Sequence, residues 1–170
     1  MRRWSATIEC ALPVGAQGRA GVNAPRRFFF YGTLLAGMET ALTRRIHAHL
    51  RALGPAQVRG RLVAICDPDG WYPALLPGEG SVAGMLYAAR PSFTRATLGE
   101  LDAYEGCSPR THGAGEYRRA AIGARLDDGR CRAAQAYRYA RPLPRGSLEL
   151  PGGDFARWLV DTGASSFRQA

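Results

Sequence analysis

The stretch Arg27-Phe28-Phe29-Phe30-Tyr31-Gly32-Thr33-Leu34 carries the strongest structural signal in this chain of 170 residues. Its run of aromatic side chains, bounded by Pro25 and Gly32, predicts a short buried β-strand. A glycine turn that leads from a strand toward a helix can point successive backbone N–H groups outward as a small cradle for an anion. The stretch matches neither the P-loop nor the G-x-G-x-x-G pattern, so it predicts no nucleotide. Taken alone, it is explained more simply as an ordinary connection between a strand and a helix.

The segments around this strand predict one α+β domain. Residues 1–25 contain several glycines and prolines without sustained periodicity and are expected to form a flexible N-terminal arm, with residues 26–165 as a single domain. Apolar spacing and turn residues predict the following further elements: a helix over Glu39–Leu53 stopped by Gly54-Pro55, a strand over Gln57–Cys66 that ends in the turn Asp67-Pro68-Asp69-Gly70, an aromatic loop from Trp71, a strand over Val82–Ala88, a helix with Ser92 as its N-cap that ends at Gly106, a hairpin of Glu116–Leu126 with Cys131–Tyr139, and a short helix from Asp154.

The order of these elements decides between fold classes. It reads β-α-β-β-α-β-β and lacks the strict alternation of strand and helix that a doubly wound sheet requires. We therefore expect a small mixed β-barrel flanked by helices.

The composition excludes several classes of protein. Apolar residues make up 46% of the chain, which is enough for a folded core, and no apolar run approaches the roughly 20 residues that cross a bilayer. Arg2 and Arg3 resemble the start of a signal peptide, but Glu9 interrupts the stretch that follows. The sequence thus predicts a cytoplasmic protein without a membrane partner.

The cysteines and histidines predict no metal site. Cys10, Cys66, Cys107 and Cys131 are far apart and form no C-x-x-C pair, and His47, His49 and His112 have no zinc-finger spacing. We expect buried free thiols, with scattered soft ligands as the less favoured interpretation.

The net charge of +9 raises the possibility of a basic nucleic-acid-binding domain. All 23 basic residues are arginines, which fits a GC-rich coding genome, and they are scattered with at most two in succession. A nucleic-acid interface more often clusters its basic residues beside exposed aromatic ones. We therefore expect no nucleic-acid partner, and an anionic small molecule fits the positive surface equally well. The sequence does not indicate the oligomeric state.

Glu105 lies in an unusual position. In the segment Leu98–Gly106 it falls in the last predicted helical turn, where the helix dipole disfavours a negative charge, and Asp102 adds a like charge three residues earlier. Both effects are expected to raise the pKa of Glu105. A residue that violates a local preference in this way often marks function. A solvated glutamate on a frayed helix end explains the same residue about as well.

Several short segments together resemble the γ-glutamylcyclotransferase-like family, which includes γ-glutamylamine cyclotransferases and AIG2-like proteins. The matching segments, between about residues 27 and 140, are Phe29-Phe30-Tyr31-Gly32-Thr33-Leu34, Gly60-Arg61-Leu62, Trp71-Tyr72-Pro73-Ala74, Val82–Tyr87, Leu101-Asp102-Ala103-Tyr104-Glu105-Gly106, Tyr117-Arg118-Arg119 and Ala136-Tyr137-Arg138-Tyr139. The resemblance implies a small β-barrel with flanking helices. It also implies an enzyme that converts a γ-glutamyl amide or peptide into 5-oxoproline and a free amine without a cofactor.

The resemblance also implies roles for individual residues. Glu105 corresponds to the family's general base and acid, and the turn of Tyr31, Gly32, Thr33 and Leu34 to the backbone groups that hold the substrate. Tyr117 corresponds to a tyrosine that lines the pocket, although the connection from Glu105 to Tyr117 is long in this sequence. The alternative is a non-catalytic AIG2-like protein that binds a small molecule or has a regulatory role. The sequence does not name the leaving group, and Trp71, Tyr72 and the loop of residues 107–116 are expected to shape that side of the pocket.

Overall fold

The computed structural model describes residues 10, 26–32, 34, 40–107 and 115–167. Among these residues the strands are β1 (Arg27–Phe30), β2 (Leu50–Asp67), β3 (Gly70–Ala89), β4 (Tyr117–Leu126), β5 (Cys131–Tyr139) and β6 (Leu148–Glu149). The helices are α1 (Ala41–Ala48), α2 (Arg95–Tyr104) and α3 (Phe155–Thr162). None of the helices in these ranges is long and apolar enough to cross a membrane.

The strands close into a small barrel, as the sequence predicted. Their order is β3-β1-β5-β4-β2, and β2 pairs with β3 again, so the ring of five strands has no free edge. β1 and β5 run parallel, the other neighbours in the ring are antiparallel, and the short β6 adds to β2. The fold is therefore a mixed α+β barrel.

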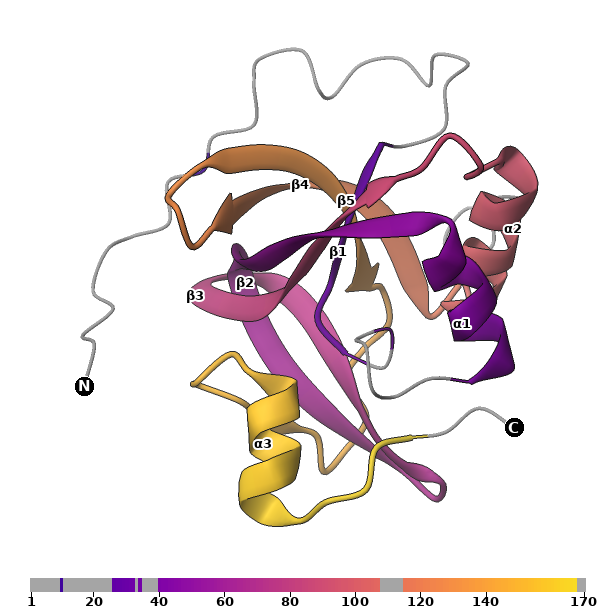
Figure 1. Cartoon of the computed structure of the whole chain (residues 1–170). Helices are drawn as coiled ribbons and strands as arrows, with labels where there is room; N and C mark the ends of the chain where they lie inside the picture. Colours follow the sequence, from indigo (N-terminus) through magenta and orange to yellow (C-terminus); the bar gives the residue numbers. More distant parts are fainter. Residues whose placement is uncertain (1–9, 11–25, 33, 35–39, 108–114, 168–170) are drawn as a thin grey trace.

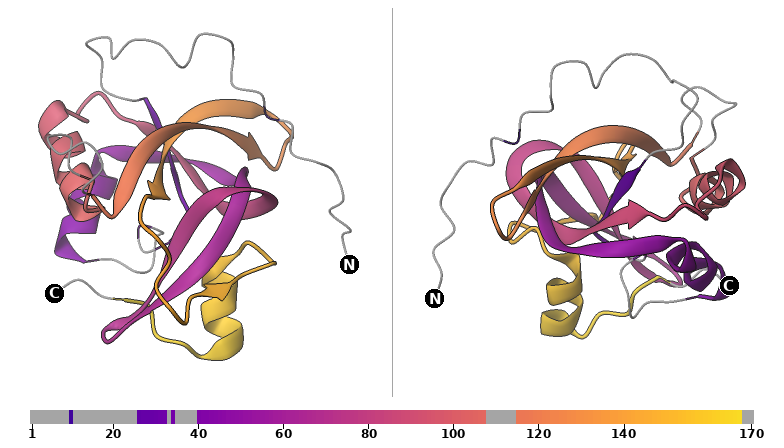
Figure 2. Two further views of the ribbon diagram at one scale, coloured as in Figure 1. Left: turned by 180° about the vertical axis from the view of Figure 1, so that it is seen from behind. Right: turned by 45° about the horizontal axis from the view of Figure 1, so that its top comes forward.

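The three helices cover two different parts of the barrel. Figures 1 and 2 show α1 and α2 next to one another on one flank, while α3 lies along the long β2–β3 ribbon. Each helix begins at a residue whose side chain accepts a backbone N–H bond, namely Thr40, Thr94 and Asp154. An ion pair of 3.4 Å between Arg45 and Glu100 links α1 to α2.

The three phenylalanines of β1 are buried on both faces of the strand. Phe29 belongs to one apolar cluster, together with Phe155 of α3. Phe28 and Phe30 belong to a second cluster, which includes Ile46 of α1. Because side chains alternate between the faces of a strand, a run of apolar residues is what a strand packed on both sides requires.

Three local predictions were wrong at the level of element boundaries. The helix predicted to reach Leu53 ends at Ala48, and β2 already begins at Leu50, which pairs with Ala89. Leu50 and Leu53 fit a helical period, but the ladder with β3 pairs Leu50 and its neighbours, and Leu53 lies at a register shift between Ala52 and Gly54.

The other two differences concern the N-cap of α2 and the segment that follows Gly70. Ser92 does not cap α2; Thr94 does, and the Ser92 hydroxyl instead lies 3.0 Å from Nδ1 of His49. The segment from Trp71, predicted as a loop, is part of β3.

The prediction of four buried free thiols was also wrong. Cys10 and Cys131 form a disulfide with their Cα atoms 5.8 Å apart, while Cys66 is exposed and Cys107 is partly buried. A separation of 121 residues hides such a pair from sequence reasoning. A side chain at Gly123 would collide with the backbone of Cys10, so this glycine allows Cys10 to approach β4 closely.

Candidate active site

A cavity of about 280 Å³ opens where the end of β1, the start of β3 and the end of α2 meet. It is lined by aromatic side chains and by three acids, and the described residues that line it include no Arg, Lys or His. Its walls contain Phe29, Phe30, Tyr31, Gly32, Leu34, Asp67, Tyr72, Pro73, Ala103, Tyr104, Glu105, Gly106, Glu116, Tyr117, Tyr137 and Phe167. A cavity lined by aromatic side chains, with a few polar groups that converge on it, is a common form of small-molecule site.

The structure brings almost all of the predicted site residues to this one cavity. Tyr31, Gly32, Leu34, Glu105 and Tyr117 line it, although they come from distant parts of the chain. Thr33 lies outside the described residues.

The turn after β1 is held by contacts on both sides. A side chain at Gly32 would run into the ring of Pro73, so only glycine allows the turn to pass β3 at this distance. The carbonyl of Leu34 lies 2.8 Å from Nε2 of His47 in α1. The strand, the turn and the first helix are thus connected at the cavity.

A line of buried hydrogen bonds connects Tyr31 to α2. The Tyr31 hydroxyl donates to the carbonyl of Tyr137 at 2.5 Å, and the Tyr137 hydroxyl donates to Oδ1 of Asp102 at 2.6 Å. Nε of Arg119 donates to the same Asp102 oxygen at 2.9 Å. Burial raises the pKa of both tyrosines, so they remain protonated donors at neutral pH.

Glu105 follows the last residue of α2 as its C-cap and lines the cavity. Gly106 then adopts a φ of 59°, a left-handed conformation that ends the helix. Although part of the residue is exposed, burial of the carboxyl group is the main cause that raises the pKa of Glu105 from 4.5 to about 8. The nearby carboxylates of Glu116 and Asp102 raise it further, in that order.

The predicted rise in the pKa of Glu105 is confirmed in direction, but its main causes differ from those expected. The helix dipole and Asp102 were the expected causes, whereas desolvation and the charge of Glu116 are the two largest ones. Asp102 has a smaller effect, and its carboxylate forms an ion pair with Arg119.

Tyr72 and Glu116 also line the cavity, and sequence reasoning had expected Tyr72 and the 107–116 loop to shape the pocket without giving either residue a role of its own. The Tyr72 hydroxyl donates to Oε1 of Glu116 at 2.8 Å, and the adjacent Tyr117 hydroxyl donates to the carbonyl of Pro73 at 2.7 Å. These two bonds join the start of β4 to the start of β3 beside the cavity. Glu116 ends the loop that was expected to shape the pocket and directly precedes the predicted pocket residue Tyr117, and both positions pointed to it.

Within the described ranges, no group of three or more His, Cys, Asp or Glu side chains is arranged to hold a metal ion. The chemistry that the described groups offer is proton transfer by a carboxyl group with a pKa near neutrality, next to tyrosine hydroxyl groups.

The fold and the site define a small closed barrel with one buried acid at the end of a flanking helix. A family model described as "Gamma-glutamyl cyclotransferase, AIG2-like" matches residues 28–157, and the chain belongs to this family. No curated protein matches the sequence at a significant level.

Solved structures with the same fold come from several organisms. An uncharacterized protein from Pyrococcus horikoshii is 19% identical with a TM-score of 0.55, and the match covers 81% of this chain and 96% of that one. An AIG2-like protein from Mus musculus is 23% identical with a TM-score of 0.53, covering 72% and 82%. The protein ytfP from Escherichia coli is 28% identical with a TM-score of 0.51, covering 76% and 95%.

Proposed function

We propose that this chain is a γ-glutamylcyclotransferase-type enzyme, which converts a γ-glutamyl amide or peptide into 5-oxoproline and a free amine. The observation that carries the proposal is the Glu105 carboxyl group, buried at a cavity with a pKa of about 8. A general base with a pKa near the working pH is both available and effective. Membership of the family supports the same reaction class.

The reaction begins with the substrate's α-ammonium group. The ionised Glu105 carboxylate removes a proton from it, and the resulting amine attacks the γ-carbonyl carbon within the same molecule. A new C–N bond closes the five-membered ring, and Glu105 passes its proton to the nitrogen of the leaving amine as the old C–N bond breaks. The ring nitrogen still carries one proton more than a lactam nitrogen holds, and Glu105 removes this second proton and gives it to the released amine. Charge balances because the ammonium consumed is replaced by the protonated amine released.

The cavity has to fold the substrate rather than activate an external nucleophile. Because the attacking amine and the carbonyl belong to one molecule, holding the reactive conformer supplies much of the rate enhancement. The acidic side chains in the wall, Glu116 and Asp67, favour the α-ammonium group by charge. The turn from Gly32 to Leu34 is the proposed docking site of the substrate's α-carboxylate, through its backbone N–H groups.

The proposal is tested with purified protein and a panel of γ-glutamyl dipeptides, glutathione and γ-glutamylamines, with 5-oxoproline measured by mass spectrometry. At least one compound is expected to yield 5-oxoproline, and Glu105→Gln is expected to abolish the release. Glu100→Gln is the matched control, because Glu100 lies on the same helix with its side chain 47% exposed. Activity that survives Glu105→Gln contradicts the assigned role of Glu105.

The same panel tests the second candidate, a non-catalytic AIG2-like binding protein. The family description includes AIG2-like members, so membership supports this candidate as well. Tight binding of one of the compounds without any turnover would establish the binding protein and exclude the enzyme.

A further inference from the structure

The segment that follows α3 is attached along the start of β3. The backbone N–H of Trp71 donates to the carbonyl of Ser165 at 2.9 Å, and the N–H of Phe167 donates to the carbonyl of Trp71 at 2.8 Å. Together with the parallel bridge between Trp71 and Ser166, these bonds hold the segment as a short extra strand. Residues 165–167 are thus tied to the edge of the β2–β3 ribbon.

Two further features fit this attachment. Gly70 has a φ of 131°, and a Cβ there would lie 2.7 Å from the backbone of Ser166 and of Phe167, so the close approach depends on a glycine. Trp158 of α3 packs its ring edge to face with Trp71, with the centroids 5.2 Å apart. The helix and the segment behind it are therefore fixed to the same strand.

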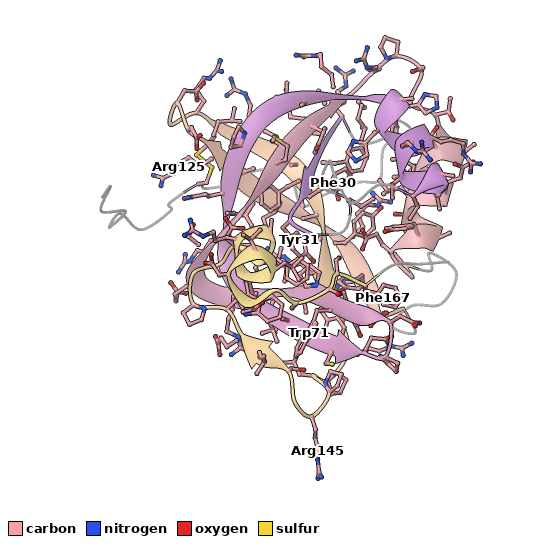
Figure 3. The ribbon with its side chains drawn as sticks, turned by 60° about the horizontal axis from the view of Figure 1, so that its bottom comes forward. Phe30, Tyr31, Trp71, Arg125, Arg145 and Phe167 are labelled. Carbon is pink, nitrogen blue, oxygen red and sulfur yellow. A yellow bond between two sulfur atoms is a disulfide. The ribbon has the colours of Figure 1, made fainter. Side chains whose placement is uncertain are left out.

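This attachment places Phe167 in the wall of the cavity. Its ring packs edge to face with Tyr72 at 5.8 Å between centroids, and both rings line the cavity. The hydrogen bond from Tyr72 to Glu116 fixes the orientation of that ring. Figure 3, in which the bottom of the molecule is turned toward the reader, labels Trp71, Phe167 and Tyr31.

Phe167 lies outside the family match. The match ends at residue 157, ten residues before Phe167. A wall residue outside the matched region can change without disturbing the reacting groups. Such a residue can therefore determine which substrates the enzyme accepts.

We propose that Tyr72 and Phe167 form an aromatic subsite for the leaving amine, and that the preferred substrates are γ-glutamyl amides of amines with an aromatic group. The substrate class rests on the proposed function. The γ-glutamyl end carries two charges and needs polar partners, which are found at Glu105 and at the turn after β1. The two ring faces offer apolar area instead, and aromatic groups pack on such rings with a gain beyond the buried area.

The test compares γ-glutamyl-phenethylamide with γ-glutamyl-ethylamide, which differ only in the phenyl ring. Their dissociation constants are measured by calorimetry on the Glu105→Gln protein, so that the compounds stay intact. Phenethylamide is expected to bind about tenfold more tightly. Adding Phe167→Ala is expected to remove most of this preference while the ethylamide affinity changes less than about twofold.

Two further variants make the result specific. Phe167→Leu keeps an apolar side chain against Tyr72 and is expected to lose only part of the preference. Val160→Ala, at an α3 residue that is 79% exposed, is expected to leave it unchanged. A preference ratio that stays the same in Phe167→Ala and Phe167→Leu overturns the proposal, and so does the absence of binding of both compounds.

The outcome separates this inference from the proposed function. If the wild-type protein releases no 5-oxoproline but the preference depends on Phe167, the subsite stands and the enzymatic function fails. If 5-oxoproline is released and the preference does not depend on Phe167, the enzyme stands and the subsite is refuted.

Discussion

Replacement of Glu105 by glutamine is expected to make the protein more stable, increasingly so as the pH rises. In the folded protein the pKa of Glu105 is about 8, compared with 4.5 for an ordinary glutamate. At about 1.4 kcal/mol per unit, this difference amounts to roughly 5 kcal/mol when the group is ionised. Glutamine occupies a similar volume and carries no charge at any pH, so it avoids this cost.

The sign follows from the protons bound in each state. Below pH 4.5 the carboxyl group is protonated both folded and unfolded, so wild type and variant differ by a constant. As the pH rises from 4.5 to about 8, the unfolded chain loses its proton while the folded chain keeps it. The wild type then loses about 1.4 kcal/mol of stability per pH unit relative to the variant, and above about pH 8 the difference levels off.

The measurement is urea unfolding, followed by tryptophan fluorescence, at pH values from 5 to 9. All other titrating groups are shared by the two proteins, so most of their effect cancels in the difference of unfolding free energies. Glu100→Gln on the same helix is expected to show a difference that does not change with pH. If the difference for Glu105→Gln is equally flat, the pKa of Glu105 is ordinary and the argument for a buried base is refuted.

Three further predictions concern the surroundings of the site. Gly32→Ala places a methyl group against Pro73 and is expected to lower the free energy of unfolding in urea by about 1–3 kcal/mol. The variant is also expected to bind substrate more weakly in calorimetry, and unchanged values of both quantities would contradict the close packing of the turn. Arg119→Met removes the ionic partner of Asp102, a residue that is only 5% exposed. The free energy of unfolding in urea is expected to fall by about 2 kcal/mol, and an unchanged value would mean that the ion pair does not contribute to stability. Alkylation of the unreduced, unfolded protein followed by mass spectrometry is expected to leave Cys131 unmodified until a reductant is added, and labelling without reductant would exclude its disulfide.

Much of the fold could be predicted from local patterns. The β4–β5 hairpin, the turn between β2 and β3, and the start of α3 at Asp154 all agree with the residues that predicted them. Each depends on turn or cap chemistry within a few residues, which sequence reasoning can assess directly. The boundary between α1 and β2 could not be predicted this way, because the pairing of Leu50 with Ala89 is a contact between distant segments.

The candidate site divides in the same way. The sequence by itself determined that a glycine turn follows an aromatic strand and that Glu105 closes a helix at an end unfavourable to an acid. Only the tertiary structure decided that these two features line one cavity, that Glu116 is the second cause of the raised pKa of Glu105, and that Phe167 completes the wall. The physical reason is that turns and helix ends are stabilised by neighbours in the chain, whereas burial and charge proximity depend on which distant segments the closed barrel brings together.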